Sequence, residues 1–401
     1  MSVASINWKG VVEIWRRSGR TAGTIALYTY WARRFVNHCS AHGKSPVACL
    51  RRRDVERVIA CGKSRYGRRG WGGGRIGLVA TRALSCALVA LGHQVPAWED
   101  DAPSAPHLAP VLRDFVEHRV RYRGVAASTI PGEVAYATSF IEFLRKRGRR
   151  VIAARLVDVD DFILRCAAQW TPKTVAGVCS ALRAFLRFLH ASGRLRFDLA
   201  SSVLSPRVRS VDRPRRALPW NDVRRILRAI DVTGPPGRRD FAVFLMMATY
   251  GMGAAEITGL ALEDLDWVAR TVRVRRPKTG STTMLPLLDP VARALARYIR
   301  RERAAHAHGR SVFVSHHLPH RPLSCSAVRN AFRQYATRAG IRAPFLGAHV
   351  LRHTHATRQI EAGAPMKIVG DILGHRRPSS TSVYVRGAII RLRAIALPVP
   401  R

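Results

Sequence analysis

Two proline-rich stretches constrain the fold of this 401-residue chain most strongly, because prolines at such density interrupt helices and strands alike. The first stretch, residues 96–110, carries four prolines and an acidic cluster, and the second, residues 205–216, carries two prolines and five arginines. They divide the chain into three parts of ordinary domain size, at residues 1–98, 107–204 and 215–401. We therefore predict three domains joined by extended linkers.

The first two parts resemble each other. An aromatic-rich segment at 24–35 runs on to Gly43, and a segment with the same internal spacing at 129–140 runs on to Gly148. Each part then ends in an apolar segment with helical periodicity, at 78–91 and at 175–189. We predict two small helical bundles. Two explanations of their likeness remain open: an ancient duplication, and the general similarity of four-helix units.

The third part mixes helices with a β-hairpin. Residues 271–275 alternate between apolar and polar side chains, residues 277–280 supply a turn, and residues 283–287 return, which predicts two antiparallel strands. The helices that we predict here lie at 221–230, 241–250, 327–339, 349–361 and 365–373. The chain is therefore predicted to be mostly α, with a small antiparallel β-sheet.

The charge of the chain indicates its partner. Lys and Arg total 68 against 26 Asp and Glu, a formal charge of +42 that is spread from end to end. Such a chain repels itself unless a polyanion neutralises it, so we predict nucleic acid as the partner. Ribosomal-type RNA binders and membrane-surface proteins share this composition. The candidate DNA contacts in the second linker are Arg207, Arg209, Arg213, Arg215 and Arg216.

Cysteine usage and hydropathy indicate a compartment. The seven cysteines are scattered without paired spacing, which is typical of reduced thiols in a cytosolic protein. Residues 1–9 contain no apolar signal core, and no window approaches 18 uninterrupted apolar residues. We expect a soluble, cytoplasmic, nucleoid-associated protein of bacterial type. We expect neither a membrane partner nor a metal, because the histidines at 316, 317 and 320 have no cysteines at zinc spacing.

Chemistry-bearing residues cluster near the end of the chain. His349 and Arg352 lie three residues apart, and therefore on one face of the predicted helix. Leu373-Gly374-His375 follows, and Tyr384 comes nine residues after that histidine. Taken singly, each feature has an ordinary explanation: an anion contact for the His–Arg pair and packing for the tyrosine.

Together, the order, spacing and neighbours of these residues closely resemble the signature of the tyrosine recombinase (phage integrase) family, H-x-x-R-H-T, then L-G-H, then a nucleophilic tyrosine. The resemblance covers roughly 215–395, the catalytic domain of that family, and 107–204 resembles its helical, SAM-like core-binding domain. The bundle at 1–98 is an extra N-terminal helical domain of DNA-binding type.

The resemblance implies a DNA transesterification without any cofactor. Tyr384 would attack a backbone phosphorus and form a 3′-phosphotyrosyl bond, releasing a 5′-hydroxyl. Arg352 would offset charge on the phosphate oxygens, and His349 and His375 would accept a proton and supply a further hydrogen bond. Lys278, in the hairpin turn, would protonate the leaving oxygen. The resemblance also implies several protomers on DNA, as a tetramer or a dimer of dimers at synapsis, and use in integration or transposition of a mobile element. It further implies that the tail at 388–401 docks on a neighbouring protomer, and the alternative is that this tail packs back onto its own domain.

One position departs from the family. Its first catalytic arginine belongs to a G-[LM]-R-x-x-E-[IL] stretch, and here Gly253 stands in its place while the surrounding pattern, including Glu256, is kept. Losing one such donor costs on the order of 10²–10³ in rate. Three explanations stay open: an engineered inactive variant, a decayed natural copy, or a chain that borrows an arginine from elsewhere. The functional alternatives are an inactive DNA-binding accessory relative and a topoisomerase-like nicking enzyme.

Overall fold

The computed structural model describes residues 6–65, 74–98, 109–207, 217–303 and 309–374. Its contacts group the chain into two compact units, one made of Met1–Asp100 with Arg215–Arg401 and the other of Asp101–Pro214. The described residues form separate hydrophobic cores in the regions before 98, from 112 to 203, and after 218. The division into three domains remains a prediction, and each part is described separately below.

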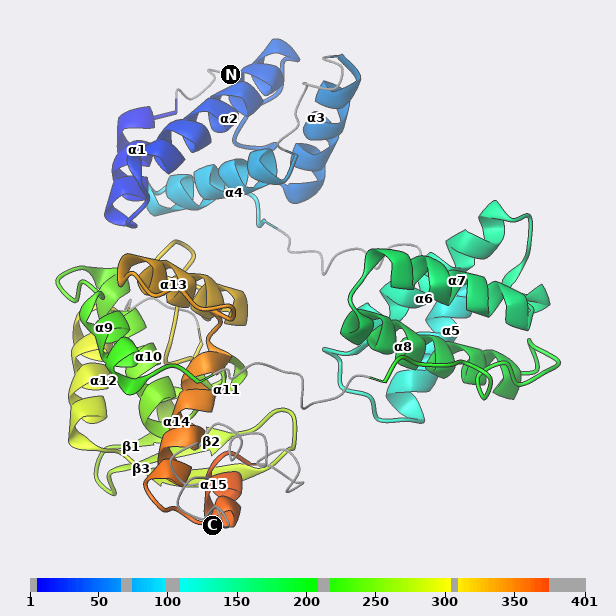
Figure 1. Cartoon of the computed structure of the whole chain (residues 1–401). Helices are drawn as coiled ribbons and strands as arrows, with labels where there is room; N and C mark the ends of the chain where they lie inside the picture. The colour runs from blue at the N-terminus through cyan, green and yellow to red at the C-terminus, as the bar shows by residue number, and fades with distance from the viewer. Residues whose placement is uncertain (1–5, 66–73, 99–108, 208–216, 304–308, 375–401) are drawn as a thin grey trace, which may run out of the picture. The chain divides into compact units, whose positions relative to one another are not determined.

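The described residues of the first part form a bundle of four helices, shown in Figure 1. They are α1 (Trp8–Arg17), α2 (Ala22–Ala41), α3 (Arg52–Arg65) and α4 (Gly74–Ala90). Trp15, Phe35 and Leu84 are fully buried or nearly so in the core that the four helices enclose. The predicted apolar helix at 78–91 is present as α4, which begins four residues earlier than predicted.

The second unit repeats this order. It contains α5 (Pro110–Arg121), α6 (Ile130–Lys146), a 3-10 turn η2 (Val151–Ala153), α7 (Leu156–Gln169) and α8 (Pro172–Ala191). Five of the buried positions of α4 (80, 83, 84, 87 and 88) have the same spacing as five of the buried positions of α8 (178, 181, 182, 185 and 186). Gly43 and Gly148 both follow a long helix in the left-handed conformation that glycine adopts without strain. Both a duplication and the general similarity of four-helix units predict such shared positions, so the two explanations remain open.

The third part is built round α10 (Pro235–Tyr250), whose side chains are mostly buried. The helices around it are α9 (Trp220–Arg228), α11 (Ala254–Thr258), α12 (Asp289–Arg301), α13 (Cys325–Arg338), α14 (His349–Glu361) and α15 (Met366–Ile372). Helix α10 begins six residues before the predicted start at 241. The reason is that Pro235 and Pro236 occupy the first turn, where a helix does not need the missing N–H.

The hairpin of the third part is confirmed. Strands β2 (Thr271–Arg275) and β3 (Thr282–Pro286) pair antiparallel, with Thr271 opposite Pro286 and Arg275 opposite Thr282. A short third strand, β1 (Leu265–Asp266), which follows the 3-10 turn η3 (Leu262–Asp264), extends the sheet in the order β1-β2-β3. In Figure 1 this sheet lies at one end of the third part, close to α15. The predicted class, mostly α with a small antiparallel sheet, is therefore confirmed.

No described helix is both long enough and apolar enough to cross a membrane.

Candidate active site and nucleic-acid interface

The candidate active site is organised by the carboxylate of Glu256. This residue is the third residue of α11, and its Oε2 accepts a hydrogen bond of 2.9 Å from the backbone N–H of Gly253, as in a capping box. Arg352, from α14, donates through Nη1 to both carboxylate oxygens at 3.1 Å and to the carbonyl of Gly251 at 3.1 Å. The start of α11 therefore holds the predicted catalytic arginine in place.

A second arginine reaches the same carboxylate. Arg276 follows strand β2 and donates from Nη1 to Oε1 of Glu256 at 2.8 Å. Its side chain is 3% exposed, compared with 13% for Arg352 and 12% for Glu256. Burial lowers the pKa of the Arg276 guanidinium from its ordinary value, and the Glu256 carboxylate opposes that shift. Two guanidiniums therefore share one half-buried carboxylate.

Both guanidiniums also bind the end of α15. Nη2 of Arg276 donates to the carbonyl of Ile372, and Nη2 of Arg352 donates to the carbonyl of Leu373. These carbonyls belong to the last turn of a helix, where the backbone leaves such acceptors without an intrahelical partner. The pair of arginines therefore positions the backbone that leads into His375.

Gly253 lies beside this cluster with room for a side chain. A Cβ atom placed on it would lie 3.9 Å from the Glu256 carboxyl carbon and 4.0 Å from Nη1 of Arg352, which are ordinary contact distances. Its backbone, at φ −80° and ψ 161°, is open to any residue. Neither space nor backbone conformation therefore requires glycine at position 253.

Gly374 is a different case. Its φ is +67°, and a Cβ atom there would lie 2.1 Å from Cδ and 2.5 Å from Nε of Arg276. The Arg276 side chain cannot move aside without losing its hydrogen bonds to Glu256 and Ile372. Glycine at 374 is therefore required for the buried position of Arg276.

We expect Gly374→Ala to destabilise the protein more than Gly340→Ala does. Gly340 has nearly the same φ, +68°, but a Cβ atom there would meet only Nη2 of Arg225, at 3.6 Å. Both variants bear the left-handed backbone cost of about 1–2 kcal/mol. Gly374→Ala adds the clash with Arg276, on the order of 1–3 kcal/mol. Urea unfolding of the two variants measures the difference, and equal losses would show that Arg276 moves freely.

The structure places some of the predicted catalytic residues and leaves others outside the described residues. Lys278 is exposed in the turn between β2 and β3, two residues after Arg276. His349 is exposed at the first residue of α14, one turn before Arg352 on the same helix. His375 and Tyr384 lie outside the described residues.

Arg276 was not among the residues predicted from the sequence. The signal for it was nonetheless present, because Val272 and Val274 point inward on β2 and the alternation continues to Arg276, which is also buried. An arginine at an inward position just after a strand needs a buried acceptor. Glu256 supplies that acceptor, and its role as the shared partner of two arginines was likewise not predicted.

The Arg-rich linker is only partly described. Arg207 is exposed at its start, and Arg209, Arg213, Arg215 and Arg216 lie outside the described residues.

The chain after the linker is anchored on α14. The backbone N–H of Leu218 donates to Oγ1 of Thr354 at 2.9 Å, and the guanidinium of Arg358 lies 4.0 Å from the ring centroid of Trp220.

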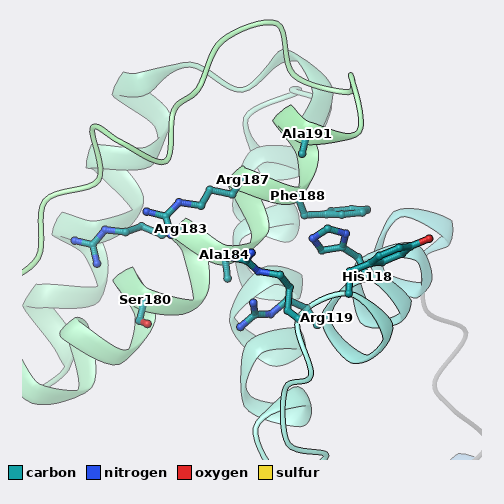
Figure 2. Close-up of a pocket in the computed structure, with 10 residues that line it drawn as sticks. His118, Arg119, Ser180, Arg183, Ala184, Arg187, Phe188 and Ala191 are labelled. Atoms are coloured by element: carbon teal, nitrogen blue, oxygen red, sulfur yellow. The ribbon is translucent and has the colours of Figure 1, made fainter.

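The second unit carries a basic cavity of about 910 Å³ between α5 and α8. Figure 2 shows Arg183 and Arg187 extending from α8, with His118 and Arg119 on the α5 side of the cavity. Arg119 is paired with Glu133 at 2.6–2.7 Å, and Arg183 donates to the carbonyl of Val203. Arg187 is exposed, and so are Tyr122 and Arg123, which also line the cavity.

Among the residues placed by the structure, no group of three or more His, Cys, Asp or Glu side chains is arranged to hold a metal ion.

Comparison with known proteins identifies a family and several relatives. Residues 216–389 match the model of the phage integrase family. The integrase/recombinase y4rA of Sinorhizobium fredii is 33% identical over 303 residues, which cover 75% of this chain and 73% of that protein. Tyrosine recombinase XerC of a Roseiflexus species is 31% identical over 280 residues, covering 67% of this chain and 87% of that protein.

The fold has a counterpart among solved structures. A lambda integrase tetramer bound to a Holliday junction superposes with a TM-score of 0.54 and 16% identity, covering 79% of this chain and 87% of that chain. The sequence relatives, the family match and the shared fold lead to one conclusion. This chain belongs to the tyrosine recombinase (phage integrase) family.

Proposed function

We propose that this protein is a site-specific recombinase that cuts and rejoins DNA strands through a 3′-phosphotyrosyl intermediate. The observation that carries the proposal is the guanidinium pair of Arg276 and Arg352 on Glu256, held against the backbone that leads into His375. A phosphate that gains negative charge in the transition state needs fixed cationic donors of this kind. The resemblance to the family then assigns Tyr384 as the nucleophile.

The other predicted residues take complementary roles in this proposal. His349 and His375 supply a proton acceptor and a hydrogen bond to the phosphate, and Lys278 protonates the leaving 5′ oxygen. The exposure of Lys278 and His349 supports these roles, because both side chains are open to a duplex laid across the site. Arg352 is half-buried and fixed by its hydrogen bonds to Glu256, and it acts as an electrostatic donor.

Duplex DNA and further protomers are the proposed partners. The charge of +42 and the basic cavity between α5 and α8 support binding along phosphates by more than one part of the chain. The lambda integrase structure contains a tetramer on a Holliday junction, and we propose a comparable assembly here. The docking of the tail at 388–401 on a neighbour belongs to this proposal, and the tail lies outside the described residues.

Gly253 favours the second candidate function, an accessory protein that binds DNA without cutting it. Trapping of a covalent adduct decides between the two. The substrates are duplexes that the protein enriches from a random-sequence library. Each duplex is prepared with a single nick, so that the strand end released by cleavage diffuses away. The duplexes are incubated with the full chain and run on denaturing gels. We expect a protein–DNA adduct that disappears in Tyr384→Phe and persists in Tyr30→Phe, since Tyr30 is an exposed residue of the first bundle.

Two outcomes would contradict the proposed recombinase. Binding without any adduct would favour the accessory function, because the chain would then hold DNA and leave its strands intact. An adduct that survives in Tyr384→Phe would assign the nucleophile to another residue.

A further inference from the structure

Three positions of the chain converge on the carboxylate of Glu256. Arg352 binds both of its oxygens, Arg276 binds one of them, and a side chain at position 253 would begin 3.9 Å from its carboxyl carbon. The place where the family has a further arginine is therefore next to a carboxylate that already holds two guanidiniums. Arg276 comes from the hairpin, on a different element from position 253.

The guanidinium of Arg276 keeps an unused donor. Its Nη1 and Nη2 donate to Glu256 and to the Ile372 carbonyl, whereas its Nε is buried and has no hydrogen-bond partner within the described part of the chain. Buried donors are almost always paired, and an acceptor that arrives with a ligand is one explanation of an unpaired one. A non-bridging phosphate oxygen is an acceptor of this kind.

The charge of the cluster also depends on Arg276. With Arg352 alone, the Glu256 carboxylate would cancel the positive charge and leave a neutral site. With Arg276 added, two guanidiniums face one carboxylate, and one positive charge remains for the phosphate. A net positive charge, fixed before the substrate binds, is what offsets the negative charge that builds on the phosphate during attack.

Gly374 makes this arrangement possible, because any side chain there would collide with Cδ and Nε of Arg276. We propose that Arg276 supplies the second guanidinium of the phosphate site, in place of the arginine that is absent from position 253. The inference rests on the recombinase function proposed above. During the step, the bond from the tyrosine oxygen to phosphorus forms as the P–O5′ bond breaks. Arg276 donates hydrogen bonds throughout and transfers no proton.

The test compares adduct formation by wild type, Arg276→Gln, Gly253→Arg and the double variant, each as the full chain. Arg276→Gln keeps amide donors in the buried position and removes the charge, and circular dichroism with duplex affinity confirms that each protein is folded and binds. Arg273→Ala is the matched control, since Arg273 is an exposed arginine of the same hairpin. Each protein is assayed on two DNA substrates. In one, the phosphate at the cleavage site is unmodified, and in the other it is replaced by a neutral methylphosphonate.

We expect Arg276→Gln to lower the rate of adduct formation by about 10²–10³ on the normal phosphate, with duplex affinity unchanged. On the methylphosphonate the deficit should shrink to less than about tenfold, because that substrate carries no charge for the guanidinium to offset. The double variant should recover most of the lost rate, because an arginine side chain at position 253 would begin beside the Glu256 carboxylate and could replace the guanidinium of Arg276 there. Arg273→Ala should match wild type on both substrates.

Two results would overturn the inference while the recombinase function stands. One is an unchanged rate in Arg276→Gln. The other is an equal deficit on both substrates, which would mean that Arg276 only supports the hairpin. An adduct formed by Gly253→Arg but not by wild type would overturn the inference and favour the accessory function for this chain. Absence of an adduct from both wild type and Gly253→Arg would overturn the recombinase function and this inference together.

Discussion

Duplex DNA binding by this protein should weaken by on the order of 10³-fold or more when the salt concentration rises from about 50 to about 200 mM. Each phosphate contact made by an arginine releases a condensed counterion, so the affinity falls linearly on a logarithmic scale, with a slope that counts the contacts. The chain carries a formal charge of +42, with exposed arginines in the second unit and at the start of its linker. Many contacts of this kind are therefore expected.

Fluorescence anisotropy of a labelled duplex at several salt concentrations measures the slope. The double variant Arg123→Ala with Arg187→Ala removes two exposed arginines that line the cavity between α5 and α8. It should reduce the slope by about 2, at about 0.9 per lost contact. Tyr384→Phe should leave affinity and slope nearly unchanged, because a neutral hydroxyl contributes little beside many ion pairs. A flat titration for the wild type would contradict DNA binding through phosphates.

Glu256→Gln should destabilise the protein by about 3–5 kcal/mol, since removing one partner of a buried ion pair leaves its charge uncompensated. Here the loss affects two guanidiniums at once, Arg276 and Arg352, and both are largely shielded from water. The backbone N–H of Gly253 also loses its carboxylate acceptor at the start of α11. We expect adduct formation to fall as well, because both donors lose their common anchor.

Glu263→Gln is the matched control for this change. Glu263 pairs with Arg310 at 3.2 Å, and the two side chains are 47% and 71% exposed. An exposed pair of this kind contributes little to stability, because water screens its charges. Chemical denaturation of the two variants should therefore give clearly different free energies of unfolding. Similar values for both would mean that water or another group compensates the arginines when Glu256 is neutral.

Several elements of the fold were predictable from local patterns. Alternation of apolar and polar side chains at 271–275 predicted β2, and the helix that carries His349 and Arg352 was predicted with its observed bounds, His349–Glu361. Helix α12 was not singled out, although Val291, Leu295 and Tyr298 recur at helical spacing and are buried. Strand β1 could not be predicted, because its two residues are too few to show an alternation of apolar and polar side chains. They form a strand only by pairing with β2.

The family signature predicted catalytic roles for five residues, Arg352, His349, Lys278, His375 and Tyr384, and it predicted that Gly253 replaces a catalytic arginine. These are properties of order and spacing, which a sequence displays directly. The two arginines that bind Glu256 could not be paired with it in this way, because they lie far from their partners in the sequence. Arg352 reaches Glu256 across 96 residues, and Arg276 reaches the carbonyl of Ile372 across 96 residues.

The sequence by itself therefore predicted many of the helices, the hairpin and the family, and it predicted a departure from the family pattern at position 253. Only the tertiary structure decided that Arg276 shares Glu256 with Arg352 and that Gly374 makes room for it. The physical reason is the range of the interactions. Burial periodicity and turn chemistry act over a few neighbouring residues. The pairing of buried charges, in contrast, depends on which distant side chains the packing of α11, α14 and α15 brings within hydrogen-bond distance.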